Sequence, residues 1–335
     1  MVGRPRFALL FATTVVILAA GCAAWLHHSL WGTRTVASIE IEIPEGSTAR
    51  RIIDQLHEEG LVPSPTSALL YLRVRATGRT MHYGRYSFEA GLRTVDVLET
   101  ILDGNPEMFE VTVVEGDTAA EIGDLFTAIG VGDREEWDVA VSRVEWIAPV
   151  IQDAPSLEGF FFPDTYRFAV GIETMDAARH LTDRFLSVWR EERRRIEKPW
   201  GSALEIVTLA SLVEAETSIA EERPVVAGVF VNRLRRGMLL QCDPTVVYAL
   251  VRRNEWRGRL LRIHWEIDDP YNTYRYPGLP PGPINCPGRA AIAAALSPAT
   301  TPALYFVAKP GGGHTFSNTL AEHNRAVARL RASRR

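Results

Sequence analysis

The sequence predicts an α+β protein that begins with a transmembrane helix, and three observations support this class. The run Phe7–Leu26 contains no charged residue. A pattern of a strand, a glycine turn and an amphipathic helix occurs twice before residue 150. The second half contains an apolar helical segment, Ala203–Ala220, followed by loops rich in glycine and proline and by a further strand. We therefore expect a membrane-proximal βα domain and then a mixed α/β domain built around a buried helix.

Composition narrows the possible functions. The 335 residues suggest about two domains at roughly 150 residues each. Hydrophobic residues make up 46% and charged residues 23%, as in globular proteins. The net charge of −4 argues against a protein that binds nucleic acid through bulk positive charge. Three cysteines cannot form a disulfide scaffold, and zinc-binding, Walker and nucleophile-elbow motifs are missing from the sequence. We expect no metal and no cofactor.

The N-terminal segment determines the compartment. About 20 apolar residues at 1.5 Å per residue cross a hydrocarbon core of about 30 Å. Arg4 and Arg6 precede the segment, and the next permanent positive charge after it is Arg34. The positive-inside rule therefore leaves residues 1–6 in the cytoplasm and places the remainder outside. Two alternatives are a cleaved signal peptide and a lipoprotein signal acylated at Cys22. All three export the rest of the chain, where ATP and nicotinamide are not supplied, and so favour hydrolytic, lytic or binding chemistry.

The repeat has an offset of 70 residues. Ile43–Ala49 returns as Val113–Ala119, and the following apolar positions also match. Ser47 and Asp117 occupy positions typical of helix N-caps. Each copy resembles a LysM-type module, a fold that holds amino-sugar glycans. The alternative is that the repeat marks only a well-capped turn from strand to helix. We assign residues 36–150 to this LysM-like, repeat-containing domain and residues 151–335 to a second domain.

Two carboxylates interrupt the apolar helix of the second half. Glu216 follows Leu209, Leu212 and Val213 by seven, four and three residues, so it projects from an apolar stripe, whereas Glu214 points elsewhere. Burial raises the pKa of a carboxyl group, as a general acid requires at neutral pH. The alternative is that the glutamate lies at the helix end and reaches solvent or pairs with an arginine.

The loops that follow have a composition suited to sugar binding. Gln241–Tyr248 begins as a polar turn and leads into a short helix. Tyr271–Tyr274 precedes the proline- and glycine-rich stretch Tyr276–Pro283, which excludes regular structure there. Aromatic rings stack on pyranose faces, and amides bond to hydroxyl groups. A strand, a glycine turn and His314 come next, in an order typical of a hairpin.

Taken together, these motifs resemble those of the endolytic murein transglycosylases, the YceG-like family. The resemblance covers nearly the whole chain. It rests on the following segments: Leu157–Tyr166, Val213–Thr217, Glu222–Arg223, Val231–Leu234, Leu240–Val246, Tyr271–Tyr274, Gly278–Ile284, Tyr305–Ala308 and Gly313–Phe316. It implies an enzyme that cleaves the β-1,4 bond between MurNAc and GlcNAc inside nascent peptidoglycan strands and leaves a 1,6-anhydro-MurNAc end. It also implies a single-pass protein of the cell inner membrane with its catalytic domain in the periplasm, near penicillin-binding proteins.

The resemblance implies that Glu216 is the catalytic residue, acting first as acid and then as base. We expect substrate contacts from a further set of residues: Glu158, Gln241, Asp243, Thr245, Asn272, Tyr274 and His314. Two other functions stay open: a hydrolytic muramidase that uses Glu216 with Asp243, and a non-catalytic peptidoglycan-binding scaffold. Cys242 and Cys286 depart from the family pattern. Both flank the expected cleft outside the membrane, so we expect a disulfide between them.

Overall fold

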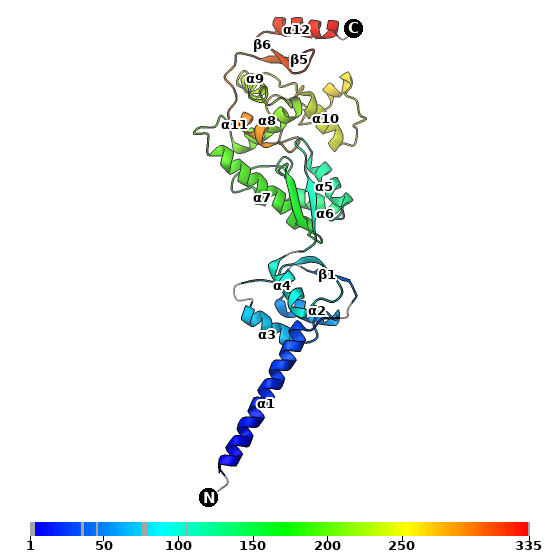
Figure 1. Ribbon diagram of the computed structural model, residues 1–335. Coiled ribbons are helices and arrows are strands. Elements are labelled where there is room, and N and C mark those ends of the chain that lie inside the picture. The colour runs from blue at the N-terminus through cyan, green and yellow to red at the C-terminus, as the bar shows by residue number, and fades with distance from the viewer. Residues whose placement is uncertain (1–3, 35–36, 45, 76–78, 105, 334–335) are drawn as a thin grey trace. The chain divides into compact units, whose positions relative to one another are not determined.

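The computed structural model describes residues 4–333 except 35–36, 45, 76–78 and 105, with side chains described from residue 11 onward. Contacts divide the chain into two compact units (Figure 1). The first comprises Met1–Glu110 and Arg167–Ile172, and the second comprises Val111–Tyr166 and Glu173–Arg335. The expected α+β class is confirmed at the level of mostly helical structure with small two-stranded sheets.

The first unit is a small α+β domain on a long helix. Its elements are α1 (Arg4–Trp31), β1 (Ile39–Ile43), α2 (Ala49–Glu58), α3 (Pro65–Arg75), β2 (Gly84–Phe88) and α4 (Thr94–Asp103). Strands β1 and β2 pair in antiparallel fashion, with Ile41 opposite Tyr86. One face of this strand pair and the apolar sides of α2, α3 and α4 form a continuous hydrophobic core.

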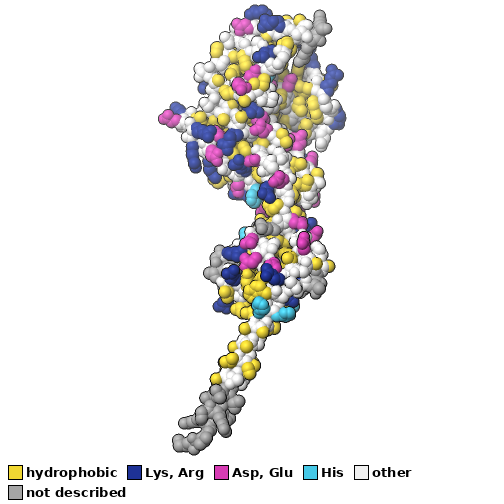
Figure 2. All heavy atoms as spheres, in the orientation of Figure 1, with side chains coloured by type: hydrophobic (Ala, Val, Ile, Leu, Met, Phe, Trp, Pro, Cys, Tyr) yellow, Lys and Arg dark blue, Asp and Glu magenta, His cyan; other side chains and the backbone are white. Residues whose placement is uncertain are grey.

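Helix α1 extends five residues beyond the expected Leu26, to Trp31. Within the described residues, Phe11–Trp31 is the one segment long and apolar enough to cross a membrane. Its apolar side chains are exposed along the helix (Figure 2), with Leu18 64% accessible. At its C-terminal end Leu30 is buried, because α1 packs there against α3 and α4.

The repeat appears in the structure as two strand–helix units, with the helix caps one residue later than expected. Thr48 and Thr118, rather than Ser47 and Asp117, are the N-caps of α2 and of α5 (Ala119–Ala128). The Thr118 hydroxyl accepts a hydrogen bond from the Glu121 N–H at 3.2 Å, and the Glu121 carboxylate accepts one from the Thr118 N–H at 2.8 Å. The Asp117 carboxylate instead accepts from the Val114 N–H at 3.0 Å and so closes the preceding turn.

The second unit is mainly helical. After β3 (Met108–Thr112) and α5 come α6 (Arg134–Val141), the 3-10 helix η1 (Val144–Trp146), β4 (Thr165–Ala169), α7 (Thr174–Arg193), α8 (Ala203–Glu216), α9 (Arg223–Arg235), α10 (Asp243–Arg252), η2 (Arg262–Glu266), α11 (Arg289–Leu296), β5 (Tyr305–Ala308), β6 (His314–Ser317) and α12 (Leu320–Ser333). Strand β3 pairs with β4, and both strands pass from one unit into the other, because 108–110 and 167–169 belong to the first unit. Strands β5 and β6 form an antiparallel hairpin.

The division between the units falls at Glu110–Val111 rather than near residue 150. The second copy of the repeat lies with the second unit because α5 packs on α6 and α6 packs on α7. The Glu158 carboxylate reinforces this packing by accepting a hydrogen bond from the Ala119 N–H, the first of α5, at 3.0 Å. The βα repeat is therefore divided between both units.

Candidate active site

Helix α8 places Glu216 at the centre of the second unit. The helix begins at a capping box formed by Ser202 and Glu205. Every residue from Ile206 to Val213 is buried, because α9, α10 and α11 all pack on α8 (Figure 1). Glu216 is the last helical residue, and Thr217 continues in an extended conformation. The sequence predicts a helix that continues to Ala220, whereas α8 ends at Glu216, so the carboxyl group emerges at the C-terminal end of the apolar helix.

A cavity of about 400 Å³ lies at this end of α8. Besides α8, its lining residues come from six parts of the unit, namely α9, the turn before α10, the start of α10, the loop after η2, the β5–β6 hairpin and α12. They are Glu216, Arg233, Leu240, Gln241, Asp243, Tyr274, Phe306, Val307, Ala308, His314 and His323. The structure therefore brings together five of the predicted site residues at one cavity.

The surroundings of Glu216 raise the pKa of its carboxyl group. Burial raises the pKa of the Glu216 carboxyl, and the nearby Asp243 carboxylate raises it further. A hydrogen bond with the Cys242 thiol and the positive charge of Arg233 act in the opposite direction without overcoming the effect of burial. A carboxyl group with a raised pKa can donate a proton to a leaving oxygen.

The Asp243 carboxylate is bonded to two aromatic side chains. Its Oδ1 accepts hydrogen bonds from the Tyr274 hydroxyl at 2.6 Å and from the Trp265 indole N–H at 3.1 Å. The Tyr274 and Trp265 rings stack at 5.1 Å with an interplanar angle of 12°. Burial and the bond to Asp243 both raise the pKa of Tyr274, so this hydroxyl remains a donor.

His314 begins β6 and is fixed by Glu222. The Glu222 carboxylate accepts from the His314 backbone N–H at 2.8 Å and lies 2.7 Å from its Nδ1. Partial burial raises the pKa of Glu222, but the bonds from His314 outweigh it and lower that pKa overall. The ring is thereby oriented by a carboxylate that stays charged, as imidazoles at functional sites commonly are.

Three predicted substrate contacts lie away from the cavity because their polar atoms are used within the protein. The Asn272 amide donates to the Trp265 and Ile267 carbonyls at 3.0 and 2.8 Å and accepts from the Tyr274 N–H at 3.0 Å. The Thr245 hydroxyl is fully buried and donates to the Cys242 carbonyl at 2.7 Å. Glu158 accepts from the Ala119 N–H and from the Tyr248 hydroxyl. None of the three is among the residues that line the cavity.

The expected disulfide is wrong for this structure, in which the three cysteines are free. The buried Cys242 side chain lies beside Glu216. Cys286 is also buried, but it belongs to the segment that bonds to the turn of the second repeat. Its N–H donates to the Asp117 carbonyl at 2.8 Å, and its carbonyl accepts from the Gly116 N–H at 3.0 Å.

Sequence reasoning missed the role of Arg233. Its guanidinium is buried and donates to the Leu304 carbonyl at 2.7 Å and to the Leu240 carbonyl at 2.8 Å. It also lies 5.1 Å from the centre of the Tyr305 ring. The residue therefore joins α9 to β5 and to the turn before α10. The sequence pattern that could have predicted this role is the basic residue that follows the apolar run Val226–Val231, because a charge in such a position is buried with a structural partner.

A second cavity, of about 570 Å³, shares Asp243 with the first. One wall comes from the turn of the second repeat, at Gly116, Thr118 and Glu121. The opposite wall is largely apolar and includes Tyr248 and Trp256. Ala215, next to Glu216, also lines it. Both cavities are therefore lined by residues at the C-terminal end of α8.

A carboxyl group with a raised pKa, close to a second carboxyl group at a cavity lined by aromatic and polar side chains, is typical of enzymes that cleave glycosidic bonds. Among the described residues, no group of three His, Cys, Asp or Glu side chains is placed to hold a metal ion.

Comparisons with known proteins agree with an enzyme that cleaves glycosidic bonds. The YceG-like family matches residues 41–329, so the chain belongs to that family. A protein of Bacillus subtilis named endolytic murein transglycosylase is 30% identical over 89% of this chain and 86% of its own length. A protein of the same name from Streptococcus pneumoniae is 29% identical, but the match spans only 58% of its length. The crystal structure of a YceG-like protein from Listeria monocytogenes has a TM-score of 0.56 at 27% identity and covers 86% of this chain and 98% of its own.

Proposed function

We propose that the chain cleaves the β-1,4 bond between MurNAc and GlcNAc within peptidoglycan strands and leaves a 1,6-anhydro-MurNAc end. The proposal rests on the observation that the pKa of the Glu216 carboxyl group is raised at the cavity. The other carboxylate at the cavity, Asp243, accepts hydrogen bonds from two donors. The names of the relatives give the same activity.

One carboxyl group is sufficient for this reaction. Protonated Glu216 donates its proton to the departing glycosidic oxygen, and positive charge develops at C1 of MurNAc. The Glu216 carboxylate then removes the proton from the 6-hydroxyl of the same sugar, and that oxygen bonds to C1. Because the nucleophile belongs to the substrate, water is not consumed, and positioning the ring contributes much of the rate.

The cavity residues have matching roles. Asp243 and Arg233 place one negative and one positive charge beside the reacting ring, and the Asp243 carboxylate stabilises positive charge at C1. Gln241, which also lines the cavity, adopts φ of 50°, a left-handed conformation that is rare for glutamine. Tyr274 and His314 provide further polar contacts to sugar hydroxyls.

Two structural features support the glycan and membrane parts of the proposal. An enzyme that cuts inside a strand needs room on both sides of the cut bond, and the two cavities at the C-terminal end of α8 provide it. The order β1–α2–α3–β2, in which the two strands pair, is consistent with a LysM-like module in the first unit. Helix α1 serves as a retained anchor in the cell inner membrane with the remainder in the periplasm, where penicillin-binding proteins act on the same strands.

The test compares the full chain with its Glu216→Gln variant on uncrosslinked glycan strands, with products identified by mass. Internal fragments one water lighter than hydrolysis products, absent with Glu216→Gln, are expected. Glu221→Gln, an exposed neighbour of the same chemistry, is the matched control and should cut normally. Products with free reducing ends would instead support a muramidase using Asp243. Binding of strands without cleavage by the unaltered protein would support the scaffold.

A further inference from the structure

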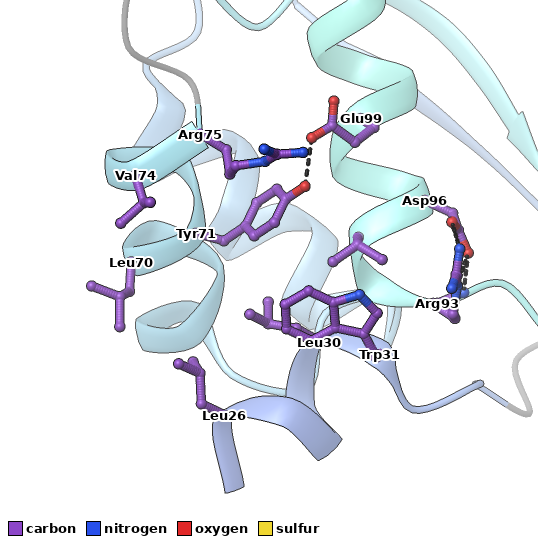
Figure 3. Close-up of a pocket in the computed structure, with 11 residues that line it drawn as sticks. Leu26, Leu30, Trp31, Leu70, Tyr71, Val74, Arg75, Arg93, Asp96 and Glu99 are labelled. Carbon is purple, nitrogen blue, oxygen red and sulfur yellow. Dashed lines mark hydrogen bonds and ion pairs between the residues drawn. The ribbon is translucent and has the colours of Figure 1, made fainter. Parts of the chain in front are cut away.

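An apolar groove lies in the first unit beside the end of α1 (Figure 3). Its volume is about 600 Å³. Leu26 and Trp31 of α1, Leu70 and Val74 of α3, and Val95 of α4 form its apolar walls. The groove is distinct from the candidate active site, and none of its lining residues has a role in the proposed reaction.

Helix α3 presents an apolar face to this groove rather than a polar one. Its buried side carries Ser67, Ala68 and Leu72. Leu70 and Val74, four residues apart and hence on one side of the helix, are 47% and 69% exposed. Figure 3 shows both side chains directed away from α4, with Leu26 on the adjacent turn of α1. Apolar side chains grouped in this way favour a partner that removes them from water.

The end of α1 is attached firmly to the walls of the groove. The Ser29 hydroxyl lies 2.5 Å from the Ser67 hydroxyl of α3. The Thr94 hydroxyl donates to the Ser29 carbonyl at 3.0 Å, and Leu30 is only 2% exposed. Trp31 packs edge-on against Tyr71 at 6.4 Å. The position of the groove relative to the apolar helix is therefore set by buried contacts.

The length of the apolar helix then places the groove at the membrane boundary. The candidate span Phe11–Trp31 has 21 residues, which at 1.5 Å each is about 31 Å and matches a hydrocarbon core of about 30 Å. Leu26 lies five residues before the end of the span, about 7.5 Å along its axis. Trp25 and Trp31, both exposed, are of the residue type enriched where lipid meets water.

We propose that the groove and the exposed face of α3 pack against the lipids of the bilayer, so that the first unit rests on the membrane surface rather than standing clear of it. This inference rests on the proposed role of α1 as a retained membrane anchor. Lipid is favoured over a second protein because Leu26 belongs both to the groove and to the lipid-facing span. Arg73, exposed near the end of α3, supplies a positive charge that attracts lipid phosphates, whereas the charge of Arg75 lies beside the Glu99 carboxylate.

The test uses the full chain carrying Cys22→Ser, reconstituted into vesicles of phosphatidylethanolamine and phosphatidylglycerol. A spin label is attached in turn at Val74→Cys, at Leu18→Cys within the span, and at Glu58→Cys on exposed α2 as the matched control. Collision rates are measured with oxygen, which concentrates in lipid, and with a water-soluble nickel chelate. The labels at 74 and 18 should favour oxygen several-fold relative to the label at 58.

The outcomes distinguish the packing of the groove on lipid from the role of α1 as a membrane anchor. A lipid signal at 18 with a water signal at 74 would overturn the packing of the groove on lipid and leave the anchor intact. A water signal at both positions would overturn the anchor itself. A label at 74 that neither reagent reaches would show that another copy of the chain covers the groove, and would also overturn the inference.

Discussion

At the scale of single residues, the proposed reaction depends on the pKa of Glu216, which some of its neighbours raise and others lower. Burial at the end of α8 and the charge of Asp243 raise it, whereas the Cys242 thiol and Arg233 lower it. The proposed reaction begins with the protonated form, so activity should persist above the ordinary pKa of a glutamate. It should fall as pH rises through the raised value.

Replacing Asp243 with asparagine removes a negative charge that opposes ionisation of Glu216. The pKa of Glu216 should therefore fall, and the alkaline limb of the kcat/KM profile should move to lower pH. The side-chain oxygen of asparagine still accepts hydrogen bonds from Tyr274 and Trp265, so the loop should keep its shape. Glu266→Gln, an exposed carboxyl outside the cavity, is the matched control and should leave the profile unchanged. An unmoved alkaline limb in Asp243→Asn would contradict the electrostatic account.

Replacing Cys242 with alanine should have the opposite effect. The thiol hydrogen bond lowers the pKa of Glu216, so its loss should move the alkaline limb to higher pH. Cys286→Ala removes an equally buried thiol that lies elsewhere and should not move the limb. Measuring both kcat/KM profiles distinguishes this effect from a general loss of packing, which would lower the rate in both variants without a shift.

At the scale of secondary-structure elements, Glu158 joins α5 to α10 by accepting from the Ala119 N–H at 3.0 Å and the Tyr248 hydroxyl at 3.2 Å. Burial raises its pKa from 4.5 to about 7. The folded chain therefore keeps this proton over a pH range in which the unfolded chain has released it. Stability should fall as pH rises from 4.5 to about 7, and this contribution should then level off.

Glu158→Gln should remove that pH dependence. The rise in the pKa of Glu158 corresponds to about 3 kcal/mol in the free energy of unfolding, at about 1.36 kcal/mol for each pKa unit. The difference in the free energy of unfolding between about pH 4.5 and about pH 8 should shrink by this order in the variant. Urea unfolding of the chain in detergent provides the measurement, and Glu221→Gln serves as the exposed control. An identical pH dependence in Glu158→Gln and the unaltered chain would show that Glu158 titrates normally.

The elements most accessible to sequence reasoning were those with a strong pattern. The apolar run of α1, the buried stripe of α8 and the strand–helix repeat follow from periodicity, whereas the choice of Glu216 as the catalytic residue comes from the resemblance to the family. Turn chemistry was harder, because Thr118 and Asp117 are both good caps and only the backbone path decides between them. Likewise, sequence cannot show that the Asn272 amide turns inward to carbonyls of its own loop.

At the scale of the whole chain, residues distant in sequence converge on one end of α8. The second repeat contributes Gly116 and Thr118 to one cavity, and the C-terminal hairpin contributes His314 to the other. Such long-range convergence is invisible to local patterns, which is why the roles of Arg233 and Glu222 were not predicted. It places two cavities, which share Asp243, near the proposed acid.

If a glycan strand occupies both cavities, Trp256→Ala should weaken the binding of long strands. The loss of an aromatic wall should cost about 1–2 kcal/mol, or roughly tenfold in KM. Fragments short enough to fill only the cavity of Glu216 should be cleaved as before. Tyr276→Ala removes an exposed aromatic ring that lines neither cavity and is the matched control. Equal losses on long and short substrates would place Trp256 outside the path of the strand.

The central claim is that the 6-hydroxyl of the substrate, and not water, attacks C1 after Glu216 donates its proton. Its most direct test is cleavage of glycan strands in water labelled with heavy oxygen, with the new ends read by mass spectrometry. The account predicts anhydro ends that contain no heavy oxygen and that disappear in Glu216→Gln. Heavy oxygen at C1 of the new MurNAc ends would show that water is the nucleophile and would contradict the proposed mechanism.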